Sequence, residues 1–140
     1  MSAHLLHLET AATLETVEDI LTAMDGFAEQ QNWPPKLAFT ARLVVEELAM
    51  NVASYGSDDP AKPPDIEITV DSEPDFLRID IKDTGRPFDP KDAPDPDINA
   101  SIEDRRIGGL GHYFVDEMTD EMVYRREDDK NHITLTIYRI

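Results

Sequence analysis

The chain has 140 residues, the length of one domain, and its 30 acidic residues against 13 basic ones give a formal net charge of −17. This charge disfavours direct binding to nucleic acids, and the lack of cysteine excludes disulfides and thiolate metal sites. No apolar run approaches the roughly 18 residues of a membrane span, and the N-terminus lacks the basic start of a secretory signal. We therefore predict a single cytoplasmic domain over residues 1–140 that binds neither nucleic acids nor membranes.

The first predicted elements are a short strand over His4–Glu9 and a helix that ends near Gln31. Thr10 or Thr13 is suited to cap this helix, because each places a hydroxyl before the periodic pattern begins. One face of the helix is apolar at steps close to the helical repeat, which predicts that this face is buried. Its members are Leu14, Val17, Ile20, Leu21, Met24 and Phe27.

A second, strongly apolar helix is predicted over Leu37–Tyr55. Pro34 and Pro35 are typical of a first helical turn, and Gly56 is a typical stop signal. We expect Trp33 to anchor the connection between the two helices. Three phenylalanines are assigned to the core: Phe27, Phe39 and Phe114.

Four more strands are predicted from the alternation of apolar and polar residues. Two of them, Asp65–Ser72 and Phe76–Asp83, are close enough in sequence to form a hairpin. The last two, Glu121–Glu127 and His132–Ile140, are joined by a turn at residues 128–131.

The segment over residues 84–107 contains four prolines and many acids. Between Asp89 and Asp104 there are six acids and one base, a composition that favours a mobile surface segment. A short helix is predicted after it, over Gly109–Met118. The order of all these elements predicts a two-layer α/β sandwich, with a mostly antiparallel mixed sheet and the helices on one face.

Glu47 and Asn51 are the first candidate functional pair. They are four residues apart on the second helix, so they project from the same side. An asparagine oxygen suits Mg²⁺, and a carboxylate one turn earlier suits a general base that takes a proton during attack on a phosphate. The alternative is an exposed polar stripe, although this helix has few polar positions.

Asp83 ends a predicted strand and opens the second candidate motif, Asp83-Thr84-Gly85. A buried carboxylate here suits an exocyclic amine such as that of adenine, and Gly85 permits close approach to a flat ring. Thr84 offers a hydroxyl to the same ring. The alternative is a turn with a solvated aspartate.

The third candidate motif is Gly108-Gly109-Leu110-Gly111 at the start of a predicted helix, preceded by Arg105 and Arg106. Consecutive glycines and a helix start favour binding of a phosphate. A flexible turn is the alternative for the glycines, and the arginines either contact phosphates or balance the acidic segment.

Taken in order, these motifs resemble those of the Bergerat-fold (GHKL) ATPases, and within them the small anti-sigma factor serine/threonine kinases. The resemblance lies in Glu47–Gly56 (the N-box), Asp83–Pro90 (the G1 box), Gly108–Gly111 (the G2 box) and the closing strand pair. Two positions depart from the family pattern: His112 stands where an apolar residue is usual, and Asp129 stands where glycine is common.

The resemblance implies ATP and Mg²⁺ as ligands. It implies that Asn51 coordinates Mg²⁺, that Glu47 is the general base with Glu46 as the next candidate, and that Asp83 binds adenine. Residues 89–107 are implied to form a lid over the ATP. The glycines implied to shape the nucleotide pocket are Gly85, Gly109 and Gly111.

The resemblance also implies partner switching. The kinase would sequester a sigma factor and phosphorylate a serine or threonine of a STAS-type anti-anti-sigma protein, and a homodimer is expected. Two other readings stay open: a nucleotide-binding module that sequesters without phosphotransfer, and an acidic interaction domain that binds no nucleotide. The four histidines, at positions 4, 7, 112 and 132, are predicted to be surface or structural residues because they are dispersed in the sequence.

Overall fold

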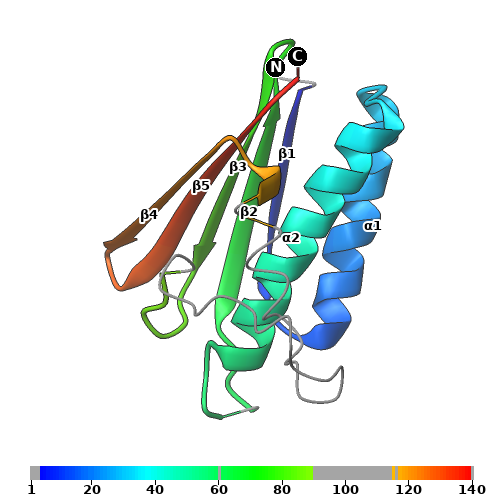
Figure 1. Cartoon of the computed structure of the whole chain (residues 1–140). Coiled ribbons are helices and arrows are strands. Elements are labelled where there is room, and N and C mark those ends of the chain that lie inside the picture. The colour runs from blue at the N-terminus through cyan, green and yellow to red at the C-terminus, as the bar shows by residue number, and fades with distance from the viewer. Residues whose placement is uncertain (1–3, 60, 90–114, 116, 140) are drawn as a thin grey trace, which may run out of the picture.

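A computed structural model of the chain describes residues 4–59, 61–89, 115 and 117–139. In order, its elements are β1 (Leu5–Ala11), α1 (Leu14–Gln30), α2 (Pro35–Tyr55), β2 (Asp65–Ser72), β3 (Phe76–Asp83), β4 (Glu121–Glu127) and β5 (Lys130–Tyr138). The two helices lie side by side on one face of a five-stranded sheet (Figure 1). The predicted two-layer sandwich is therefore confirmed.

The strands are arranged in the order β1-β2-β3-β5-β4, and all four pairings are antiparallel. The prediction of a mixed sheet is thus wrong for the described strands. Both helices lie between β1 and β2 in the sequence. β2 nevertheless pairs directly with β1, in the antiparallel direction.

Local sequence explains where the helices begin and end. Thr13, not Thr10, caps α1: its hydroxyl accepts a hydrogen bond from the Thr16 backbone N–H at 3.1 Å, and the Thr16 hydroxyl accepts one from the Thr13 N–H at 2.9 Å. α2 starts two residues before the predicted Leu37 and ends at Tyr55 as predicted. Gly56 has φ −70°, a value that any residue can adopt, so its backbone conformation does not require glycine. Lack of space does, because a Cβ there would lie 2.6 Å from the Val52 carbonyl oxygen.

The core lies between the helices and the inward face of the sheet. Phe27 and Trp33 are buried in it with their rings edge to face, and the Trp33 Nε1–H donates to the Ser72 hydroxyl at 2.9 Å. Trp33 is thus the anchor that the sequence predicts. Phe39 is 62% exposed, so its assignment to the core is wrong, and Phe114 lies outside the described residues.

The bounds of β1 and β5 also differ from the prediction. β1 continues to Ala11, and β5 begins at Lys130 and ends at Tyr138, so the turn before it has two central residues, Asp128 and Asp129. Both have positive φ, 52° and 60°, the conformation that such a hairpin turn requires and that glycine or asparagine adopts more easily. None of the helices in the described residues is long and apolar enough to cross a membrane.

Candidate active site

Glu47 and Asn51 lie one turn apart on α2, as predicted, and the Asn51 side chain is one of the groups that affect the pKa of Glu47. The Oε1 atom of Glu47 is buried and has no hydrogen-bond partner. Burial raises the pKa of Glu47, the neighbouring charge of Glu46 raises it further, and the polar side chain of Asn51 lowers it. Glu46 is engaged differently, because its carboxylate accepts a hydrogen bond from Arg42 Nη1 at 3.1 Å.

Asp83 is 4% exposed at the end of β3, so the alternative of a solvated aspartate is wrong. Its Oδ1 atom accepts two hydrogen bonds, from the Gly85 backbone N–H at 2.9 Å and from Asn131 Nδ2 at 3.0 Å. Burial raises the pKa of Asp83, although these two bonds and the charge of Arg126 lower it.

Gly85 packs against the end of α2. A Cβ on Gly85 would lie 2.9 Å from the Gly56 Cα and 2.9 Å from Asp83 Oδ1. The adjacent Arg86 backbone N–H donates to the Gly56 carbonyl at 3.0 Å, so the two segments are held together. The close approach that Gly85 permits in this structure is therefore to another backbone. The Thr84 hydroxyl accepts a hydrogen bond from the Asp65 backbone N–H at 2.8 Å.

Asn51 and Asp83 line a common cavity. The volume of this cavity that water-sized molecules can enter is ≈ 50 Å³. α2 forms one wall, and the start of β5 and the segment after β3 form the others. Glu47 lies one helical turn before Asn51 and is not among the residues that line this cavity. The lining residues are Leu48, Asn51, Val52, Tyr55, Gly56, Asp83, Arg86, Phe88, Asn131 and Ile133.

Asn131 is a cavity residue that the sequence analysis missed. It is 3% exposed, and it was predicted to lie in a turn, whereas it is the second residue of β5. A usable signal was present, because Asn131 has the same parity along the strand as the inward-facing residues Ile133, Leu135 and Ile137.

The phosphate-binding motif cannot be placed. Arg105, Arg106, Gly109, Leu110 and Gly111 lie outside the described residues, as does the predicted lid apart from Asp89. Of the predicted helix over Gly109–Met118, residues 115, 117 and 118 are described and are helical.

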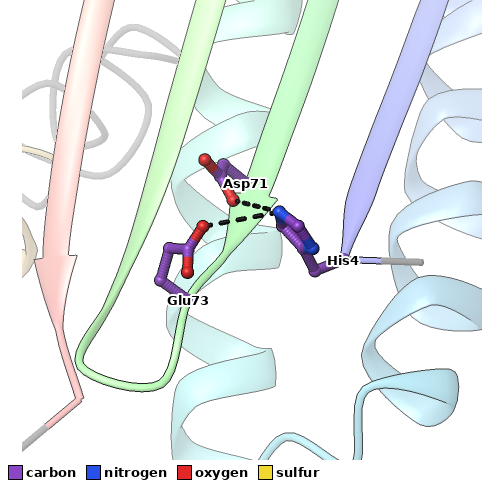
Figure 2. A group of neighbouring side chains, drawn as sticks. All are labelled: His4, Asp71 and Glu73. Carbon is purple, nitrogen blue, oxygen red and sulfur yellow. Dashed lines mark ion pairs between the residues drawn. The ribbon is translucent and has the colours of Figure 1, made fainter. Parts of the chain in front are cut away.

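Although the histidines are dispersed in the sequence, His4 and His7 each lie close to carboxylates in the structure. His4 Nε2 lies 3.5 Å from Asp71 Oδ1 and 3.4 Å from Glu73 Oε1, as Figure 2 shows. His7 forms a similar group with Glu9 and Glu67, and each group offers three possible metal ligands. All of these residues are partly or largely exposed; they lie on β1, on β2, just before β1 or just after β2. We assign them as ion pairs of the sheet surface.

Comparison with known proteins identifies the family. The family model described as "Histidine kinase-like ATPase domain" matches residues 10–137. The chain belongs to this family. The resemblance to the Bergerat-fold ATPases is thereby confirmed.

Individual relatives agree with this assignment. The serine/threonine-protein kinase BtrW of Bordetella bronchiseptica is 30% identical over 136 residues, which cover 97% of this chain and 95% of BtrW. A structure of the RsbU and RsbW domains of Rv1364c from Mycobacterium tuberculosis is similar with a TM-score of 0.65 at 13% identity, over 97% of this chain and 33% of that longer one. The catalytic domain of the histidine kinase ThkA matches with a TM-score of 0.53 at 11% identity, over 96% of this chain and 97% of its own. At these identities, the two structures support the fold.

Proposed function

We propose that this chain is an ATP-dependent serine/threonine kinase that sequesters a sigma factor and phosphorylates a STAS-type anti-anti-sigma protein. The observation that carries the proposal is the buried Oε1 atom of Glu47, unpartnered in the described structure, one helical turn from Asn51, which lines the cavity. A buried carboxylate oxygen without a partner lowers the stability of the fold, so a role with a ligand accounts for its presence. The relative BtrW, named as a serine/threonine kinase, supports the same conclusion.

The donor set fits Mg²⁺ and ATP. Two oxygen-bearing side chains, Glu47 and Asn51, are four residues apart on one side of α2, and hard oxygen ligands suit Mg²⁺. We assign the coordination of Mg²⁺ to the Asn51 side-chain oxygen, where the ion would neutralise charge on the phosphates. By the same resemblance, we assign the phosphates to Arg105, Arg106 and the glycines of residues 108–111, with residues 89–107 as the lid.

Asp83 is assigned to the adenine amine. Its Oδ1 atom already accepts two hydrogen bonds, so Oδ2 is the oxygen that we assign to the base. A carboxylate accepts hydrogen bonds and donates none, so it favours an amine at this position over the carbonyl of guanine or hypoxanthine.

Glu47 is assigned as the general base of phosphotransfer. The hydroxyl oxygen of the substrate serine or threonine attacks the γ-phosphorus of ATP while the bond from that phosphorus to the β-γ bridging oxygen breaks. The hydroxyl proton passes to the Glu47 carboxylate, and ADP leaves with the bridging oxygen. The raised pKa of Glu47 makes it a better proton acceptor than an exposed glutamate.

A volume of ≈ 50 Å³ holds only a few water molecules, so we expect side chains at the rim of the cavity to move when the base binds. Tyr55 and Phe88 line the cavity and are 50% and 43% exposed. Their rings are only half packed, so turning them outward removes little buried area. We therefore assign the opening to these two side chains.

Phosphotransfer is tested with labelled ATP, Mg²⁺ and STAS-type proteins from the same organism. The expected result is transfer of the γ-phosphate by the wild-type chain and by Glu46→Gln, with transfer by Glu47→Gln slower by about 100-fold or more. ATP affinity should be the same in all three. Binding of ATP without transfer to any candidate would leave sequestration as the function, and absence of ATP binding would refute the proposal.

Partner binding and assembly need separate measurements. We expect the purified chain to form a homodimer in light scattering and to bind a sigma factor in pull-down experiments. We also expect phosphorylation to release the STAS-type protein, because added phosphate charge disrupts an interface with a chain of net charge −17.

A further inference from the structure

Asn131 uses the whole hydrogen-bonding capacity of its side chain at the cavity. Its Nδ2 donates to Asp83 Oδ1 at 3.0 Å and to the Arg86 carbonyl at 2.7 Å. Its Oδ1 accepts from the Phe88 backbone N–H at 3.2 Å and from the Tyr124 hydroxyl at 2.7 Å. An amide has two donors and two acceptor sites, so all four are occupied. The reverse orientation of the amide would place the NH₂ group against the Phe88 N–H and the amide oxygen against the Asp83 and Arg86 oxygens.

Three of these four partners belong to the site. Asp83, Arg86 and Phe88 all line the cavity, whereas the turn residues next to Asn131 in sequence take no part in the network. Antiparallel pairing places Asn131 directly opposite Asp83 on β3, although they are 48 residues apart in sequence. One side chain therefore holds both the carboxylate and the segment that follows it.

We propose that Asn131 is a positioning residue that sets the selectivity of the site for adenine. With the Gly85 N–H, the Asn131 amide fixes the rotation of the Asp83 carboxylate, so that Oδ2 is the oxygen left for the base. The bonds to Arg86 and Phe88 fix the backbone of the cavity rim at the same time. This inference rests on the proposed nucleotide-binding function and adds to it a selectivity determinant on β5.

The test compares the affinities of Mg-ATP and Mg-ITP, since ITP carries a carbonyl where ATP carries the amine. For the wild-type chain we expect a ratio Kd(ITP)/Kd(ATP) of about 10 to 150. This ratio corresponds to the free energy of one hydrogen bond to a charged group. Asn131→Asp keeps the size of the side chain and both acceptor contacts, but it loses both donors. We expect it to lower the ratio by about tenfold, because Asp83 is no longer held in one orientation.

The ratio separates positioning from a general structural role. A carboxylate at position 131 weakens both nucleotides through charge, and this effect cancels in the ratio. The matched control is Thr134→Val on the same strand, which removes the 2.7 Å bond from Thr134 Oγ1 to Asp80 Oδ1 on the opposite face of the sheet. It should leave the ratio unchanged.

The possible outcomes each decide the matter. A folded Asn131→Asp chain that keeps the wild-type ratio overturns the inference and leaves Asp83 as the base-binding residue. If that variant does not unfold cooperatively, Tyr124→Phe decides instead: it removes the hydroxyl that orients Asn131, and an unchanged ratio overturns the inference. A wild-type chain that binds neither nucleotide refutes the proposed function, and with it this inference.

Discussion

Replacing Asp83 by asparagine separates the requirements of ligand binding from those of folding. Two groups donate hydrogen bonds to Oδ1, the Gly85 N–H and Asn131 Nδ2, and both remain in the variant. Each can donate only to an oxygen of the new side chain. The new side-chain NH₂ group must therefore take the position of Oδ2. There it would face the adenine amine, donor against donor, and the hydrogen bond to the base would be lost.

The expected effect on affinity is large. Loss of a hydrogen bond to a charged group is worth about 1.5–3 kcal/mol, which weakens ATP binding by about 10- to 150-fold. The effect on the apo protein has the opposite direction. Because burial raises the pKa of Asp83 overall, the ionised carboxylate lowers the stability of the fold at neutral pH, and the uncharged asparagine removes that penalty.

A thermal shift experiment measures both effects. At an ATP concentration of 100 Kd, the wild-type chain gains about 2.7 kcal/mol, and at roughly 3–4 °C per kcal/mol for this length Tm rises by about 8–11 °C. If Asp83→Asn binds 100-fold more weakly, the gain falls to about 0.4 kcal/mol, or about 1 °C. Its Tm without ATP should equal or exceed that of the wild type. Asp80→Asn, on the opposite face of the sheet, is the control. A full ATP shift in Asp83→Asn, or a Tm several degrees lower without ATP, would refute the reasoning.

Three further predictions concern stability. Burial raises the pKa values of Glu47 and Asp83, so the native state binds their protons more tightly than the unfolded state does. The free energy of unfolding should therefore fall as the pH rises from about 4 through the raised pKa values. Urea titrations from pH 4 to 8 should show a smaller fall for the Glu47→Gln, Asp83→Asn double variant. Gly85→Ala should lower Tm by the equivalent of about 1–3 kcal/mol because its Cβ would meet the α2 C-cap glycine, whereas Gly26→Ala, with nothing within 4 Å, should raise it. Phe39→Ser should change the unfolding free energy by less than about 0.5 kcal/mol, and a loss of several kcal/mol would mean that the ring is packed in the folded protein.

The sequence predicted the elements well because their signals are local. Alternation of apolar and polar residues located β2 and β3 with the bounds that the structure has, and the helical repeat located both helices. Phe39 was misassigned by residue type alone. The buried positions Ala41, Val44, Val45 and Leu48 define the inward face of α2, and Phe39 does not fall on it.

The site was only partly predictable, for a physical reason. Glu47 and Asn51 are neighbours on one helix, so spacing alone places them together. The role of Asn131 depends on which residue it faces, and this follows from the register between β3 and β5, set by the pairing of whole strands. Placing the start of β5 two residues late hid Asn131 in a turn, although the alternation continues back to it.

Contacts at the cavity hold the end of α2 against the segment after β3. Gly56 and Gly85 bring the end of α2 against the segment after β3, and the Arg86 N–H fastens them through the Gly56 carbonyl. Burial opposes the ionisation of two carboxyl groups on these elements, Glu47 on α2 and Asp83 at the end of β3. A fold selected for stability alone would replace both with neutral residues. The presence of Asp83 in the cavity and of Glu47 one helical turn from Asn51, another cavity residue, is therefore an argument for a bound ligand that has an amine at one end and needs a proton acceptor at the other.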